Sequence, residues 1–210
     1  MNGVIFVISS PTGAGKTTLC NLVEKERDDV QRVITHTTRK PREGEKNGVD
    51  YHFVSNEEFK RMIKMGEFVE YAFVHSNFYG TSKKALVDVL NQGKFPILAI
   101  DVQGAKNIAN SFDNVVNIFI LPPDFDIWLE RIKKDRSRDS LSVRLKTAVN
   151  ELSELEFFDY CIINDSLEQS LKKLHSIIDA ATSKIAFFKE DYLKLANTLK
   201  NDIKEFLGGE

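Results

Sequence analysis

The stretch Ser9–Thr18, which reads SSPTGAGKTT, combines residue types that bind phosphate. Gly13 and Gly15 permit positive φ angles, so that backbone N–H groups can converge on an anion. Lys16 would reach the β- and γ-phosphates of a nucleotide, and Thr17 would offer its hydroxyl to Mg²⁺. We predict that the whole loop contacts the nucleotide, and its residues are Ser10, Pro11, Thr12, Gly13, Ala14, Gly15, Lys16, Thr17 and Thr18.

The strict phosphate-loop pattern has glycine where this chain has Ser10. That position makes the turn out of a strand, where a small residue suffices. The alternatives are a dinucleotide-binding loop and a chance glycine-rich turn. The dinucleotide pattern lacks its third glycine at Thr18, and no acidic residue ends a second strand about twenty residues later. The order of strand, loop and helix favours the phosphate loop.

A second group of cations lies between Thr35 and Glu45, where Arg39 and Arg42 flank Pro41. Two guanidinium groups on a stiff turn suit a phosphate, because each presents a planar fork of donors. A solvated pair of charges is the simpler alternative. Basic residues also gather in a third segment and are either a solvated helix face or a lid over phosphate: Arg131, Lys133, Lys134, Arg136, Arg138, Arg144 and Lys146.

The elements that must position these residues follow from the apolar runs. Val4–Ile8 reads as a strand buried on both faces, and similar runs occur at Pro96–Ile100, Val115–Leu121 and Tyr160–Ile163. Helical spacing separates these runs, and the expected buried faces include Leu19, Leu22 and Val23; Leu86, Val87 and Leu90; Ile127, Leu129 and Ile132; Leu145, Val149 and Leu152. This alternation predicts an α/β fold with a parallel sheet and helices on both sides.

The region from Val33 to Tyr79 breaks that alternation and predicts an inserted lobe. Its short apolar pieces, Tyr51–Val54 and Phe68–Val74, predict short antiparallel strands. Ser55 with Glu58 predicts a capped helix running to about Met65. No glycine or proline occurs between Pro123 and Gly208, so the last third should be mostly helical, with Ser166 and Gln169 capping its last long segment.

The composition is that of an ordinary soluble globular protein of 210 residues, with 42% hydrophobic and 29% charged residues. The net charge of −2 gives no reason to expect a nucleic acid or membrane partner, and no apolar run is long enough to cross a bilayer. Cys20 and Cys161 both have apolar neighbours and are expected in the core. We predict a cytoplasmic protein.

Five motifs resemble those of a known family and follow one another in the same order as in that family: Thr37–Glu45, Gly48–Phe53, Tyr79–Thr81, Ile100–Gly104 and Asp159–Asp165. Together they resemble guanylate kinases over about residues 3 to 180. The resemblance implies a P-loop NTPase three-layer fold with a central parallel sheet, an inserted small mixed α/β GMP-binding lobe and a helical lid. The implied parts are a core of residues 1–33, 81–128 and 147–210, a GMP-binding lobe of residues 34–80, and a lid of residues 129–146.

The resemblance also implies roles for individual residues. The phosphate of GMP would be held by Arg39, Arg42, Tyr51 and Tyr79. Guanine would be read by Glu70, Asp101, Thr35 and Thr81, with carboxylates for its donors and hydroxyls for its acceptors. The residues acting on the transferred group would be Lys16, Arg39, Arg131, Arg136 and Arg144. Mg²⁺ would be held by Thr17 and, through water, by Asp101.

The chain departs from the family pattern in places. Thr35 and Thr81 stand where serine is usual, Ala99 where many members are acidic, and the lid has Arg136-Ser137 in a segment about two residues short. Arg136 and Arg138 compete for one role there. Asn164 either contacts the adenine side of ATP or serves as a turn and helix cap.

The implied activity is transfer of the γ-phosphoryl group of ATP to GMP, with Mg²⁺, giving ADP and GDP. GMP is mostly a dianion at pH 7, so no general base is needed, and closure of the lobe and lid would exclude water. The main alternative is a non-catalytic guanylate kinase-like protein-binding module, which typically lacks the phosphate loop. A kinase acting on another phosphate ester is a second alternative, against which Glu70 and Asp101 argue.

The tail beyond Lys184 carries an apolar stripe interrupted by Asp202, and its members are Ile185, Phe188, Tyr192, Leu195, Leu199 and Phe206. The stripe packs either on the chain's own core, which we slightly favour, or on a second subunit. The expected state is therefore a monomer or a homodimer formed through the C-terminal helix. The four histidines show no metal-ligand spacing: His36 and His52 would at most line the site, and His175 is expected on the surface.

Overall fold

The computed structural model describes residues 3–74, 76–134 and 140–208. Its central sheet has five strands in the order β2-β7-β1-β8-β9, and every pairing between them is parallel. The strands are β1 (Ile5–Ser9), β2 (Val30–Arg32), β7 (Phe95–Ala99), β8 (Val115–Leu121) and β9 (Tyr160–Ile163). The chain departs from β1 to one side and later returns to the other, so the carboxyl end of β1 is the place where such sheets bind ligands.

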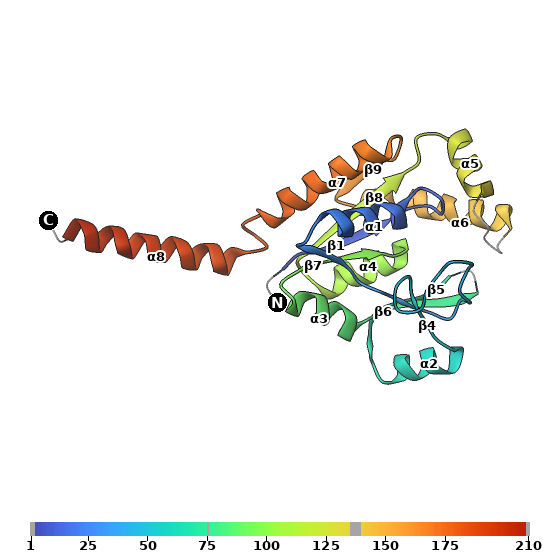
Figure 1. Cartoon of the computed structure of the whole chain (residues 1–210), viewed down its shortest axis with the longest axis horizontal. Helices are drawn as coiled ribbons and strands as arrows, with labels where there is room; N and C mark the ends of the chain where they lie inside the picture. Colours follow the sequence, from blue (N-terminus) through green and yellow to red (C-terminus); the bar gives the residue numbers. More distant parts are fainter. Residues whose placement is uncertain (1–2, 75, 135–139, 209–210) are drawn as a thin grey trace.

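Helices cover both faces of this sheet (Figure 1). Val4, Phe6 and Ile8 point to one face and share a core with α1 (Lys16–Glu26) and α7 (Leu167–Thr182). Ile5 and Val7 point to the other face, against α3 (Lys83–Asn91) and α4 (Val102–Ser111). The predicted three-layer α/β fold is confirmed, because the central strand alternates two apolar faces that each need a layer of helices.

The edge strand β9 differs from the prediction. Only Ile162 of its four residues is buried, whereas Tyr160, Cys161 and Ile163 are exposed. The expectation that Cys161 lies in the core is therefore wrong, while Cys20 on α1 is fully buried as predicted. A short apolar run carries the same signal at the centre of a sheet and at its edge, where one side has no neighbouring strand.

The inserted lobe contains a four-stranded mixed sheet in the order β4-β3-β6-β5 and one helix, α2 (Asn56–Lys64). Its strands are β3 (His36–Thr37), β4 (His52–Phe53), β5 (Phe68–Val74) and β6 (Asn77–Ser82). The β5–β6 pairing is antiparallel as predicted, but β4 pairs parallel with β3, so that part of the prediction is wrong. The predicted cap is confirmed, because Ser55 accepts a hydrogen bond from the backbone N–H of Glu58.

The lid region contains α5 (Phe125–Lys134) and α6 (Leu141–Ser153), followed by a 3₁₀ turn at Leu155–Phe157. The buried side chains of the two helices are Trp128, Ile132, Arg144 and Ala148. The predicted faces are partly wrong, since Ile127 and Val149 are exposed. The competing residues Arg136 and Arg138 lie outside the described residues.

The C-terminal third forms two helices, because α7 ends at Thr182 and α8 (Lys189–Gly208) begins after a short turn. Ser166 is the N-cap residue of α7, but its side chain makes no capping hydrogen bond. The helix α8 extends away from the rest of the molecule (Figure 1). Phe188 packs on the chain's own core as favoured, but Ile185 is exposed and so is the stripe from Tyr192 onward, so the prediction is wrong for those residues. Within the described part of the chain, no helix is long and apolar enough to span a membrane.

Candidate functional site

The phosphate loop, residues 10–15, connects β1 to α1 at the carboxyl edge of the central sheet. Gly13 and Gly15 have φ angles of 83° and 101°, a region that side chains with a Cβ rarely enter. Gly15 is required for a second reason, since a Cβ there would lie 2.3 Å from the side-chain nitrogen of Asn164. The loop therefore keeps a shape that needs these two glycines, while Ser10 is buried at the turn out of the strand and its hydroxyl donates to the Pro11 carbonyl at 2.9 Å.

Two side chains from distant elements hold carbonyl groups of this loop. The indole nitrogen of Trp128 donates to the Thr12 carbonyl at 2.9 Å, and the Asn164 amide donates to the Ala14 carbonyl at 2.8 Å. In a planar trans peptide the C=O of one residue and the N–H of the next point in opposite directions. Holding these carbonyls outward therefore turns the N–H groups of Gly13 and Gly15 toward the interior of the loop, where a phosphate would bind.

We predict that Asn164→Ala raises the KM for Mg-ATP about 10-fold while leaving the KM for GMP within about 2-fold, because one loop N–H loses its orientation. Trp128→Phe keeps the aromatic ring but removes the donor, and should shift the KM for Mg-ATP in the same direction. Steady-state kinetics with each nucleotide varied in turn would measure this. Asn150→Ala, an exposed residue on α6, is the matched control. An equal rise in both KM values would indicate general damage instead.

Lys16 lies at the first position of α1, and its ammonium donates to the Ile100 carbonyl at 2.9 Å. Ser9 also donates to that carbonyl, so β1, the loop and the end of β7 meet at one point. Thr17 and Thr18 follow on the exposed side of the first turn. The positive end of the α1 dipole, the loop N–H groups and Lys16 together make this point attractive to phosphate.

Asn164 illustrates a role that neither sequence alternative describes. It follows β9 and is buried, its amide holds the loop, and its backbone carbonyl accepts a hydrogen bond from Arg131 at 3.1 Å. The cap of α7 is Ser166 and not Asn164. Asn164 thus connects the lid helix α5 to the phosphate loop through its own backbone and side chain.

The second anion site is organised around Arg39. Its guanidinium makes two hydrogen bonds, of 2.8 and 2.9 Å, with the Glu45 carboxylate, and it lies over the ring of Tyr51 at 5.3 Å. Tyr51 and Tyr79 are in edge contact, with ring centroids 6.1 Å apart. Burial opposes ionisation of Glu45, but hydrogen bonds from Arg39 and from the Arg42 backbone outweigh it and lower its pKa. The predicted phosphate residues Arg39, Tyr51 and Tyr79 therefore lie together.

Glu45 orients the Arg39 fork, so we predict that Glu45→Gln raises the KM for GMP about 5-fold with little change for ATP, as expected for the loss of one charge-assisted contact. Steady-state kinetics with GMP varied would measure this effect. Glu43→Gln, an exposed neighbour on the same loop, is the control. A lower KM for GMP would contradict the idea, because it would mean that Glu45 competes with the phosphate.

The residues predicted to read guanine include a buried carboxylate, Glu70, and a buried hydroxyl, Thr81. Glu70 on β5 is 6% exposed, and the Thr81 hydroxyl on β6 donates to it at 2.6 Å. Burial raises the pKa of Glu70 to about 7, the nearby charge of Asp101 adds to the rise, and the Thr81 hydrogen bond opposes it. Glu70 is thus not a surface carboxylate. Thr35 is also buried, and Asp101 is the N-cap of α4, accepting from the Gly104 N–H at 2.8 Å.

A further acidic residue, Glu151 on α6, was not predicted. One of its carboxylate oxygens is buried without a hydrogen-bond partner in the described residues. Burial raises its pKa to about 7, with the charge of Lys16 opposing and that of Asp101 adding to the rise. Glu151 is therefore a partly buried carboxylate within the electrostatic influence of Lys16 and Asp101. The signal in the sequence was the helical spacing of Arg144, Ala148 and Glu151, which places two charges on the buried face.

The predicted lid arginines are held by main-chain carbonyls in this structure. Arg131 donates to Asn164, and Arg144, which is 5% exposed, donates to the Ile132 carbonyl at 2.9 Å. Arg136 lies outside the described residues. The structure thus brings Arg131 and Arg144 to the side of the phosphate loop through Asn164 and Ile132, and Ile132 itself packs near Gly13.

The rings of His36 and His52 lie against each other at a tilt in the lobe, with centroids 4.6 Å apart. Burial and the neighbouring His52 lower the pKa of His36 to about 4, so its ring is neutral at pH 7. Over residues 3–74, 76–134 and 140–208 no group of three or more histidine, cysteine or acidic residues is arranged to hold a metal ion.

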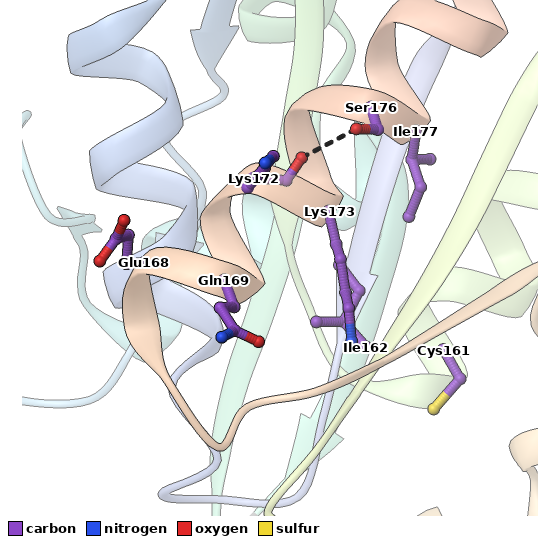
Figure 2. Close-up of a pocket in the computed structure, with 8 residues that line it drawn as sticks. All are labelled: Cys161, Ile162, Glu168, Gln169, Lys172, Lys173, Ser176 and Ile177. Atoms are coloured by element: carbon purple, nitrogen blue, oxygen red, sulfur yellow. Dashed lines mark hydrogen bonds between the residues drawn. The ribbon is translucent and has the colours of Figure 1, made fainter.

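A hollow of about 630 Å³ lies away from these residues, between β9 and α7 (Figure 2). Figure 2 shows Lys173 of α7 extending toward β9, where Ile162 and Cys161 lie, and the Ser176 hydroxyl donating to the Lys172 carbonyl within the same helix. None of the predicted site residues lines it. The hollow lies between a helix and an edge strand, whereas the groups predicted to bind phosphate lie around Lys16.

Comparisons with known proteins agree with this arrangement. The guanylate kinase family model matches residues 3–181. The guanylate kinase of Clostridium perfringens (strain 13 / Type A) is 41% identical over 194 residues, covering 91% of this chain and 90% of that protein. That of Rickettsia felis is 42% identical, covering 87% and 96%. The crystal structure of guanylate kinase from Anaplasma phagocytophilum has a TM-score of 0.74 and 37% identity, covering 87% of each chain.

Proposed function

The chain belongs to the guanylate kinase family and is a GMP kinase, and we propose that it transfers the γ-phosphoryl group of ATP to GMP, giving ADP and GDP. The observation that carries this reading is the presence of two anion sites. One is the phosphate loop with Lys16, and the other is the Arg39 cluster with Tyr51 and Tyr79. A loop alone binds one nucleotide, whereas two sites allow phosphate to pass between two nucleotides.

In this proposal, ATP lies along residues 10–18 with its phosphates against the inward N–H groups of Gly13 and Gly15. The GMP phosphate is held by Arg39, Arg42, Tyr51 and Tyr79. Glu70 and Asp101 accept the guanine donors, and Thr35 and Thr81 stand beside them. Because the Thr81 hydroxyl donates its hydrogen bond to Glu70, Thr81 orients that carboxylate and does not donate to guanine.

The residues present fit a magnesium ion that arrives with ATP. Oxygen donors are what Mg²⁺ prefers, and it usually keeps several waters. Thr17 is an exposed residue at the start of α1, and the charge of Asp101 acts on Glu151. The buried Glu151 oxygen, which has no hydrogen-bond partner among the described residues, would accept from metal-bound water. When bound, the ion neutralises charge on the transferred phosphoryl group. The residues of this chain then align the two nucleotides and exclude water.

The GMP dianion is the nucleophile, so the chain needs to bring the substrates together and stabilise charge. We propose that the lobe of residues 34–80 closes over GMP and the lid of residues 129–146 closes over ATP. Arg131 and Arg144 would then exchange their main-chain carbonyl partners for phosphate oxygens, with Arg136 joining them. The cytoplasmic location stays a prediction, and so does the choice between monomer and homodimer.

A coupled assay of ADP release tests the proposal, with Mg-ATP and a panel of GMP, dGMP, AMP, CMP and UMP. We expect rapid turnover with GMP and at least about 10³-fold lower kcat/KM with AMP, because adenine presents an acceptor where Glu70 needs a donor. No turnover with GMP would favour the non-catalytic protein-binding alternative. Turnover with AMP equal to that with GMP would refute the roles of Glu70 and Asp101.

A further inference from the structure

The helix α8 carries an apolar face that the described structure leaves uncovered. The apolar stripe of α8 consists of Tyr192, Leu195, Leu199, Ile203 and Phe206, whose exposed fractions are 39%, 58%, 52%, 58% and 74%. With 3.6 residues per turn these five side chains fall on one side of the helix. The stripe includes Ile203, which the sequence pattern left out, and it runs over the whole length of α8.

The helix is attached to the body of the protein at its base alone, among the described residues. Phe187 and Phe188 pack against the core formed with α7, and Phe188 contacts Phe95 and Tyr192 edge to face. From Lys189 to Leu207 every residue is exposed. Figure 1 shows α8 pointing away from the sheet, so its stripe lies far from the catalytic lobe and lid.

Such a helix is unfavourable on its own. Most helical stability in proteins comes from packing of an apolar face, so an unpaired α8 would lack its main source of stability. A bilayer surface is a poor partner for α8, because interfacial helices are rich in Lys and Arg on their polar face. Here the charges balance, with Lys189, Lys194, Lys200 and Lys204 against Glu190, Asp191, Asp202 and Glu205.

The charges beside the stripe favour a second copy of the same helix. Lys189 and Lys200 border the stripe on one side, while Asp191 and Asp202 border it on the other. If two copies pair in parallel, the basic border of each faces the acidic border of the other. In an antiparallel pair, like charges would face each other. Lys200 and Asp202 are two residues apart, so in a parallel pair they lie at nearly the same height, about 3 Å apart along the axis.

We propose that this chain forms a homodimer by parallel pairing of the α8 stripes. The helix is about 30 Å long and about 10 Å wide, so the contact is small compared with a standard interface. The dimer should therefore be reversible, with a dissociation constant in the micromolar range. In a parallel pair the two bodies lie at the same end of the paired helices, where α8 joins the rest of each chain. This proposal is independent of the residue roles given above.

Sedimentation velocity of the full chain from about 1 to about 200 µM tests the pairing, spanning the expected dissociation constant. We expect a shift from monomer to dimer with concentration. Leu199→Asp should remain a monomer throughout, while Asn197→Asp on the opposite, polar face should still form dimers. Both variants should keep full GMP kinase activity. A wild-type monomer at every concentration, or a dimer of Leu199→Asp, would overturn the proposal.

A charge swap tests the orientation. Lys200→Glu should weaken the dimer, and adding Asp202→Lys to the same chain should restore it, because the two borders are then exchanged there. Antiparallel pairing predicts the opposite, since Lys200→Glu would relieve repulsion and strengthen the dimer. Co-sedimentation with phosphatidylglycerol vesicles distinguishes the other occupant. Vesicle binding by a chain that stays monomeric in solution would refute self-pairing.

Discussion

Replacing Lys16 with methionine is expected to lower kcat by about 10³-fold. The ammonium is the cation at the end of the phosphate loop, and loss of one preorganised charge contact to a transition state typically costs this much. The fold should survive, because Ser9 still donates to the Ile100 carbonyl that Lys16 contacts in the free protein. Methionine keeps most of the aliphatic length of the side chain, so the loss reports the charge.

The measurement is steady-state kinetics with GMP and Mg-ATP both saturating, together with a thermal unfolding curve. Lys25→Met is the matched control, since Lys25 is an exposed residue in the last turn of the same helix. We expect its kcat to equal that of the wild type. If Lys16→Met retained more than about a tenth of the wild-type kcat with an unchanged unfolding curve, the assignment of the ATP site would be wrong.

The residues of the phosphate loop could be predicted from sequence, whereas the residues that hold the loop could not. Gly13, Gly15 and Lys16 are adjacent in the chain, so their spacing carries the signal. Trp128 and Asn164 act on the same loop from more than a hundred residues away. Single-sequence patterns contain no information on such contacts. Trp128 falls outside the predicted helix face, and Asn164 lies in a stretch, Asn164–Ser166, whose residue types are those of an ordinary turn.

The pairing of the strands and their positions at the edge of a sheet could not be predicted for the same reason. The apolar run around His52 predicted a strand correctly, but its parallel partner β3 is set by how the lobe chain returns to the sheet. The run at Tyr160–Ile163 has the composition of a central strand and lies at the edge. For α8, helical spacing predicted the stripe, yet what covers a stripe depends on the direction of the helix, which the turn after Thr182 determines.

Replacing Glu70 with glutamine should lower kcat/KM for GMP by about 10²-fold, because a carboxamide would turn a donor toward the donor edge of guanine. Glutamine is nearly isosteric and still accepts the Thr81 hydroxyl through its oxygen, so the site keeps its shape. The KM for Mg-ATP should stay within about 2-fold, since Glu70 lies on the lobe. Kinetics with GMP and with Mg-ATP varied in turn measures both effects.

The same variant should change the pH dependence of kcat/KM. With a pKa raised to about 7 by burial, Glu70 is largely protonated in the free enzyme at pH 6, and guanine binding requires the carboxylate. Wild-type kcat/KM for GMP should therefore fall below pH 7, with a further fall near pH 6 from the GMP phosphate. Glu70→Gln should lose the part of the fall that Glu70 causes and retain the fall near pH 6. A variant profile identical to the wild type would contradict this role.

Stability provides a separate readout with a defined sign. The pKa of Glu70 is about 7 in the folded state and near 4.5 when unfolded, so between these values the folded state binds more protons. The free energy of unfolding must then fall as pH rises from 4.5 to 7, by up to about 3 kcal/mol for Glu70. Glu151, whose pKa is also about 7, acts in the same direction.

Urea unfolding at pH 5 and pH 8 should show a smaller pH effect on the free energy of unfolding in Glu70→Gln. The effect should be unchanged in Glu168→Gln, a variant of an exposed residue on α7. If Glu70→Gln kept the full pH effect, the carboxylate of Glu70 would not be buried as the structure describes. The selectivity of the enzyme for guanine would then have to come from other residues.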